Sequence, residues 1–219
     1  MPYDTFFNLP DEKRESVIEA SLEEFALYDY KTASLSTIVE KVGIAKGSMY
    51  QYFENKKDLY LYLIDYAAKV KLDYLSRNAP AASGKDFFEV YKDISYESTK
   101  FNLSNPKYSR ILYHAARETF NEELGDVAVQ LRTVSKNYMK ERLAKAQEEG
   151  QVRKDVDLDL MAFCVSQLSI DLEDYLSNKF NFSYGDMLKN GREDLPVSHD
   201  KVEEILEELI SFFKRGLNA

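Results

Sequence analysis

Residues 34–57 read SLSTIVEKVGIAKGSMYQYFENKK, and this stretch predicts two short helices joined by a tight turn. Ser34 is a good helix N-cap, and the apolar residues after it recur at the three-and-four spacing of one buried helix face. Gly43 can adopt the left-handed conformation that ends a helix, with Ile44 packing back on the preceding turn. A second helix follows at once. The residues expected to face inward from it are Ala45, Met49, Tyr52 and Phe53.

The opposite face of this second helix carries side chains that suit DNA, and no acid lies between Lys46 and Phe53. Lys46, at the helix start, can meet a phosphate, and Gly47 lets the backbone approach a duplex at a cost of about 1 kcal/mol relative to alanine. Serine and glutamine can bond to base edges, and tyrosine hydroxyls suit phosphate oxygens. The predicted DNA-binding residues are Ser34, Ser36, Lys46, Gly47, Ser48, Tyr50, Gln51, Tyr52 and Lys56.

The run VGIAKGSMYQYFENKKDLY resembles the recognition helix and the next helix start of the tetracycline-repressor (TetR) family of bacterial transcriptional regulators. The shared pattern is a glycine turn, a small residue, Lys-Gly-Ser, an aliphatic residue and a Tyr-x-aromatic-Phe run. It ends with Asn-Lys and an acid before leucine. The resemblance covers the first part of the chain, whereas the remainder agrees with the family only in being helical and of suitable length.

Two other interpretations of the motif are a packed helical corner without DNA contacts and a phosphate-binding loop. The uninterrupted polar face and the position near one end of the chain argue against a simple corner. The run GIAKGS lacks the spacing between two glycines and a lysine that a nucleotide-binding loop requires.

Composition predicts an all-α protein, because the chain has few glycines and prolines and no alternating strand pattern of useful length. The resemblance implies an N-terminal three-helix DNA-binding domain with a helix-turn-helix and a larger C-terminal helical domain for ligand binding and dimerisation. We place the first domain at residues 1–56 and the second at residues 57–219.

The formal net charge of −9 argues against a nonspecific nucleic-acid coat. Residues 30–58 nevertheless carry five lysines and three acids, which leaves a local balance of +2 over the motif. This balance is small for a DNA-binding domain, so we expect affinity to depend on dimerisation and on a defined site.

Cysteine and histidine are scarce in this chain. The single Cys164 rules out an intramolecular disulfide, and His114 and His199 are too far apart in sequence to predict a metal site. We expect no cofactor. Because no signal peptide or membrane-length apolar run is present, we expect a cytoplasmic protein.

The rest of the chain predicts a series of helices. Residues 1–9 read as an arm, and a helix begins at Pro10 with an inward face of Val17, Ile18, Ser21, Leu22 and Phe25. The acids Glu15, Glu19, Glu23 and Glu24 are expected on its solvated face. Further helices are predicted over 57–77, 85–105, from Pro106, and over 122–149, 158–180 and 198–217, with a loop at 78–84 and a connection or short helix within 181–197.

The middle helices of a TetR-like protein would enclose a ligand cavity, and their aromatic and polar residues supply candidates for its lining. Ordinary core packing is the alternative for each of them. The candidates are Tyr66, Tyr91, Tyr96, His114, Arg117, Phe120, Phe163 and Gln167.

The last two long helices are apolar around more than one face, which predicts either burial in the chain centre or contact with a second copy. The resemblance favours a four-helix bundle formed by two subunits. The candidate interface residues are Leu168, Leu172, Tyr175, Leu176, Ile205, Leu209, Phe212 and Phe213.

Together these features predict a ligand-responsive transcriptional regulator. By resemblance it would be a repressor that binds a palindromic operator as a homodimer and is released by a small hydrophobic or aromatic molecule. The sequence leaves two alternatives open. One is a helical-bundle enzyme, for which no nucleophile or acid-base pair stands out, and the other is a dimeric adaptor or small-molecule-binding protein that does not read DNA.

Overall fold

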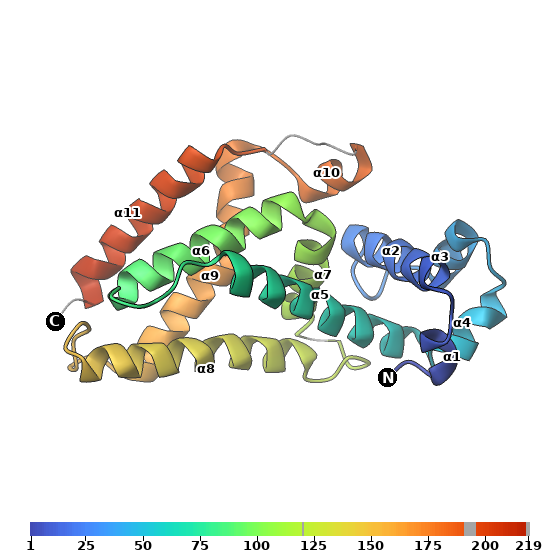
Figure 1. Ribbon diagram of the computed structural model, residues 1–219, viewed down its shortest axis with the longest axis horizontal. Helices are drawn as coiled ribbons and strands as arrows, with labels where there is room; N and C mark the ends of the chain where they lie inside the picture. The colour runs from blue at the N-terminus through green and yellow to red at the C-terminus, as the bar shows by residue number, and fades with distance from the viewer. Residues whose placement is uncertain (120, 191–195, 218–219) are drawn as a thin grey trace. The chain divides into compact units, whose positions relative to one another are not determined.

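The structure, a computed structural model, describes residues 1–119, 121–190 and 196–217. Every regular element in this part of the chain is an α-helix, which confirms the all-α fold (Figure 1). The helices are α1 (Asp4–Phe7), α2 (Asp11–Leu27), α3 (Leu35–Val42), α4 (Lys46–Tyr52), α5 (Lys56–Asn78), α6 (Phe87–Ser104), α7 (Pro106–Arg117), α8 (Val127–Glu148), α9 (Leu158–Phe180), α10 (Tyr184–Asn190) and α11 (His199–Leu217).

The helices form two compact units, each assembled from separate parts of the chain. Unit 1 contains Met1–Leu72, Asn105–Ala128 and the segment that begins at Tyr184 with α10. Unit 2 contains Asp73–Ser104, Val129–Ser183 and the segment with α11. The N-terminal helices thus share a unit with α7, while the division of function at residue 56 stays a proposal.

The turn between α3 and α4 forms as its sequence predicts. The Ser34 hydroxyl accepts a hydrogen bond from the Thr37 N–H (3.4 Å) and caps α3. Gly43 ends the helix with φ of +72°, where a residue with a side chain would be strained. The Ile44 N–H donates to the Val39 carbonyl (3.0 Å), which closes the turn over the last residues of α3.

The core of unit 1 lies along α2. The five predicted inward residues, from Val17 to Phe25, are all buried, as are Ile38 and Val39 of α3. Helix α7 also packs against α2, with Ile111 and Ala115 buried, so α2 is covered by the next helix, α3, and by α7, which is distant in sequence.

The N-terminal arm contains a short helix that the sequence did not predict. Phe6 of α1 is fully buried, and its ring lies 4.8 Å from that of Phe53, between centroids. The Tyr3 N–H donates to the Tyr52 carbonyl (2.9 Å). The arm therefore fixes the C-terminal end of α4.

The core of unit 2 joins four helices. Its buried side chains include Phe87, Phe88 and Tyr91 of α6, Met139 and Leu143 of α8, Met161 and Val165 of α9, and Ile210 and Phe213 of α11. Helices α6 and α11 lie side by side (Figure 1).

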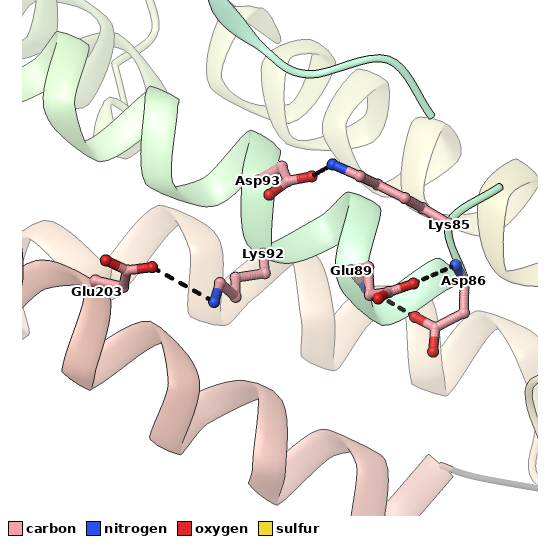
Figure 2. A network of polar contacts seen from close by, with 6 residues as sticks. All are labelled: Lys85, Asp86, Glu89, Lys92, Asp93 and Glu203. Atoms are coloured by element: carbon pink, nitrogen blue, oxygen red, sulfur yellow. Dashed lines mark hydrogen bonds and ion pairs between the residues drawn. The ribbon is translucent and has the colours of Figure 1, made fainter. Parts of the chain in front are cut away.

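Polar contacts fix the start of α6 (Figure 2). Asp86 Oδ1 accepts from the Glu89 N–H (2.8 Å), and Glu89 Oε2 accepts from the Asp86 N–H (2.9 Å), so two helix-end donors are satisfied by one reciprocal pair. Lys85 bonds to Asp93 within the same region. Lys92 reaches Glu203 of α11 at 3.6 Å and joins the two helices.

Helix α8 begins later than predicted, at Val127 in place of residue 122. Asn121 Oδ1 accepts from the Glu123 N–H (3.1 Å), and Gly125 has a φ of +60°, so the chain turns before the helix begins. Within the predicted connection 181–197, α10 forms a short helix, and residues 191–195 lie outside the described part.

Candidate nucleic-acid interface

One face of α4 is open to solvent and carries most of the predicted DNA-reading side chains. Lys46, Gly47 and Gln51 are exposed, and 49% of the Tyr50 surface is accessible. Ser48 is half-buried on the same short helix. The arrangement places one cation, two hydroxyls and one amide on a surface without an acid, which suits phosphate and base-edge contacts.

The inward face of α4 agrees with the sequence prediction except at Ala45. Met49 and Phe53 are buried, which ties α4 to the core of unit 1. Ala45 is exposed, because it is the N-cap of α4 and its extended backbone lies outside the helix. Tyr52 is only 6% exposed and lies 6.1 Å from the Phe6 ring. We therefore leave Tyr52 out of the proposed contact set.

Gly47 is not required by the packing of its own chain. A Cβ atom built at this position meets no heavy atom of the structure within 4 Å, and its φ is not in the left-handed region. Glycine here costs helix stability without relieving an internal clash. Its use is explained if another molecule approaches the backbone of α4 closely.

Lys56, predicted as a DNA contact, is occupied within the chain. Its Nζ donates to the carbonyl of Ala33 at 2.6 Å and to that of Lys31 at 3.4 Å, and it lies 4.9 Å from the centre of the Tyr30 ring. Burial lowers the pKa of Lys56. These contacts hold the segment before α3, so we assign Lys56 a supporting role.

The start of α3 also faces solvent. Ser36 is exposed there, and Ser34 is half-buried with its hydroxyl bonded to Thr37. Glu24 is buried with 7% exposure, and its Oε1 accepts from the Ser34 N–H at 2.7 Å. The prediction that Glu24 lies on a solvated face is wrong, because this carboxylate anchors the residue that caps α3.

A contact between Tyr30 and Glu118 was not identified from the sequence. The Tyr30 N–H donates to Glu118 Oε1 (3.0 Å), although the two residues are separated by 88 positions. The Tyr30 ring lies 5.2 Å from Tyr60 of α5. The end of α7 is thereby linked to the segment that precedes α3 and to α5. No local sequence pattern marks such a pair.

Similarity to known proteins agrees with this geometry. The family described as "Bacterial regulatory proteins, tetR family" matches residues 17–63, which include α3 and α4. A solved TetR family transcriptional regulator from Chloroflexus aurantiacus J-10-FL is 32% identical, with a TM-score of 0.82 over 100% of this chain and 99% of that one. The chain belongs to the TetR family.

Two curated relatives of this TetR-family protein are repressors. The probable acrEF/envCD operon repressor of Escherichia coli K12 is 22% identical over 69% of this chain and 70% of the relative. The transcriptional repressor AcnR of Corynebacterium glutamicum is 21% identical over 69% of this chain and 75% of the relative. The protein is a DNA-binding transcriptional regulator, as the TetR resemblance of its α3–α4 motif implied.

The predicted ligand-binding residues of the TetR-family regulator belong to both units. Tyr66, His114 and Arg117 belong to unit 1, whereas Tyr91, Tyr96, Phe163 and Gln167 belong to unit 2. Phe120 lies outside the described residues.

The individual contacts of these candidates are those of packing and surface residues. The Tyr91 hydroxyl lies 2.8 Å from Ser169 Oγ, and Phe163 is 54% exposed. The Arg117 guanidinium lies 3.7 Å from the centre of the Tyr113 ring. Of the described candidates, Tyr91 also borders a cavity of unit 2, considered below.

The predicted dimer residues of the TetR-family regulator divide into three groups by exposure. Leu176, Ile205 and Phe213 are buried within unit 2, so their apolar character is explained by one chain. Three others are exposed, namely Leu168 (41%), Tyr175 (46%) and Phe212 (69%). Leu172 and Leu209 are half-buried.

Helix α9 exposes further apolar side chains, Leu160 at helical spacing from Leu168 and Phe163 at helical spacing from Leu160. These positions and Tyr175 form one stripe along the helix, which we call the α9 stripe. Burial of such a stripe against a second copy would remove a large apolar surface from water.

No helix in the described part of this TetR-family chain combines the length and apolar character needed to cross a bilayer. Among the same residues, His, Cys, Asp and Glu side chains form no group of three or more that is suited to hold a metal ion.

His114 of α7 gives the stability of unit 1 a predictable pH dependence. Its Nε2 lies 3.3 Å from the Ala26 carbonyl oxygen. Burial, with a smaller contribution from the Arg110 charge, lowers the pKa of His114 from 6.5 to about 4, although Ala26 and Asp29 oppose the shift. The folded state therefore favours the neutral ring, and this contribution to stability is present above pH 6.5 and lost as the pH falls toward 4.

We expect a His114→Gln variant to lose less stability than the native protein between pH 6.5 and pH 4. Thermal unfolding followed by circular dichroism at several pH values would measure the stability of both proteins. The difference between the two stabilities at each pH isolates His114, because the carboxylates are the same in both proteins. Parallel stability curves for the two proteins would contradict the assignment.

Proposed function

We propose that the protein is a homodimeric repressor that binds a palindromic operator through α4 and is released by a small molecule. The observation that carries this proposal is the exposed face of α4, where Lys46, Ser48, Tyr50 and Gln51 surround a glycine that internal packing does not require. Because the chain as a whole has a charge of −9, we expect binding to need this local face and a defined site.

Dimerisation would supply a second copy of α4, so that each half of a palindromic operator is contacted by one recognition helix. A two-fold axis places two recognition helices in successive major grooves, about 34 to 36 Å apart. The exposed α9 stripe and Phe212 support a shared interface, since a single chain leaves these apolar side chains in water.

Ligand release requires that an effector bind better to a conformation that does not fit the operator. To change the ratio of the two conformations from 1:99 to 99:1, the effector must bind the favoured conformation more tightly by about 5.5 kcal/mol. Helix α5 follows α4 directly in sequence and contributes residues to both units. The hydrogen bond from Tyr30 to Glu118 links the end of α7 to the segment before α3. We propose α5 and α7 as the elements that transmit the change. As a regulator that binds DNA, the protein would act in the cytoplasm.

The proposal is tested by selecting bound sequences from a random double-stranded DNA pool with purified protein, followed by gel shifts with the selected site. We expect an enriched inverted repeat with half-site centres about 10 base pairs apart, or a multiple of this spacing. We also expect specific binding to weaken as salt concentration rises. Failure to enrich any sequence from the pool would overturn the proposal in favour of an adaptor that does not read DNA.

A further inference from the structure

Unit 2 contains a cavity of about 450 Å³ bordered by α6 and α8. This volume lies within the range of about 300 to 1,000 Å³ that small-molecule sites occupy. The floor is formed by the core side chains Phe87, Tyr91, Met139 and Ala146, and Val90 and Ile94 extend the apolar wall. An apolar body would fit against this surface.

The charged side chains around the cavity are mostly neutralised by partners. Lys85 is bonded to Asp93 (Figure 2), and Lys145 lies 3.7 Å from Glu149. Asp86 lies 3.3 Å from Lys214. Equal numbers of cations and acids line the space, so the lining does not favour a polyanion such as a nucleotide.

Arg142 differs from the other two cations of the lining. Its guanidinium carbon lies 5.0 Å from the centre of the Tyr138 ring, one helical turn earlier on α8. In the described parts of the chain, no carboxylate forms an ion pair with Arg142. The guanidinium is planar by resonance, and its N–H groups form the fork that binds a carboxylate with two parallel hydrogen bonds.

We propose that this cavity binds a monocarboxylate with an apolar body, an aliphatic or aromatic acid. The carboxylate would accept hydrogen bonds from Arg142, and the body would cover Val90, Ile94 and Met139. A single negative charge suits Arg142, the lining cation that no described carboxylate pairs with, although the acid Glu141 also borders the cavity. Apart from Tyr91, the residues of this site are not among those that the sequence indicated. The role of the ligand as effector rests on the proposed function, whereas binding itself does not.

Titration calorimetry with purified protein tests the site directly. The probes are decanoate and 2-naphthoate, each used below its aggregation concentration, with decanol and 2-naphthol as matched neutral compounds. We expect each acid to bind at least about tenfold more tightly than its neutral counterpart, because a charge-assisted pair with arginine is lost in the alcohols.

The Arg142→Gln variant should lose about tenfold or more in affinity for the acids and little for the alcohols. Lys140→Gln, which removes a cation of the same helix that pairs with Asp159 and does not line the cavity, is the control and should have a small effect. Unchanged thermal unfolding of both variants shows that the fold is retained. Three results would overturn the site. They are equal affinity for an acid and its alcohol, an equal loss of acid affinity in the two variants, and no binding of either acid.

Gel shifts with added decanoate separate this inference from the proposed function. Release of DNA from the native protein but not from Arg142→Gln would support the effector role. Binding of the acid that depends on Arg142, combined with failure to select any DNA, would retain the site and reject the repressor. Binding of the acid without any change in DNA affinity would reject the effector role.

Discussion

Replacing Lys46 and Tyr50 together by alanine should lower the affinity for the operator by a factor of about 100 or more. Both side chains lie on the exposed face of α4, where a lysine and a phenol can reach phosphate oxygens. A dimer loses each contact twice. Because neither residue belongs to the core of unit 1, the fold and the oligomeric state should be retained. Gel shifts with the selected operator measure the loss of affinity.

The matched control replaces Lys13 and Tyr28 by alanine. These residues are also exposed in unit 1, but they lie outside α4, and the loss of one cation and one tyrosine is the same. The control should bind the operator nearly as well as the native protein. Sequence-specific binding by the Lys46 and Tyr50 double variant, at native strength, would refute the role of α4.

A double substitution of Leu168→Glu and Tyr175→Glu should convert the proposed dimer to a monomer. Both residues are exposed on the α9 stripe, so carboxylates are tolerated in the single chain but would be buried without partners in an interface. Sedimentation velocity should show a monomer at concentrations where the native protein is a dimer. Operator affinity should fall by a factor of about 100 or more, since a monomer contacts one half-site.

Leu72→Glu is the control for this substitution. Leu72 is 65% exposed on α5 and is not part of the α9 stripe, so a carboxylate there should leave the dimer intact. Dimerisation of the Leu168 and Tyr175 double variant would show that the interface lies on another face. A native monomer that binds the complete palindrome would contradict the two-fold arrangement.

The helix-turn-helix could be predicted in detail because its signals are local. Ser34 and Gly43 determine the ends of α3 through bonds to residues three to five positions away, and such bonds follow from side-chain chemistry. The limits of α5 and α9 likewise follow from apolar spacing and end signals, and the structure confirms them within one residue.

Contacts between distant parts of the chain could not be predicted in this way. Glu24 was assigned to a solvated face because glutamate is usually exposed, yet it is buried and accepts from the Ser34 N–H. The bond from Lys56 to the Ala33 carbonyl was likewise not predicted. The pairing of Tyr30 with Glu118 depends on how α7 packs on α2. An apolar side chain in α9 looks the same in sequence whether its own chain covers it, as at Leu176, or leaves it exposed, as at Leu168.

The packing of α7 on α2 limits how regulators of this kind can be recombined. Lys107 pairs with Glu19, and His114 lies at the Ala26 carbonyl, so α2 depends on residues encoded far downstream. A chimera that joins residues 1–56 to the remainder of another family member would replace these partners and expose a surface shaped for α7. Exchange of the solvent-facing side chains of α4 alone avoids this problem, which makes operator specificity easier to transplant than the segment that carries it.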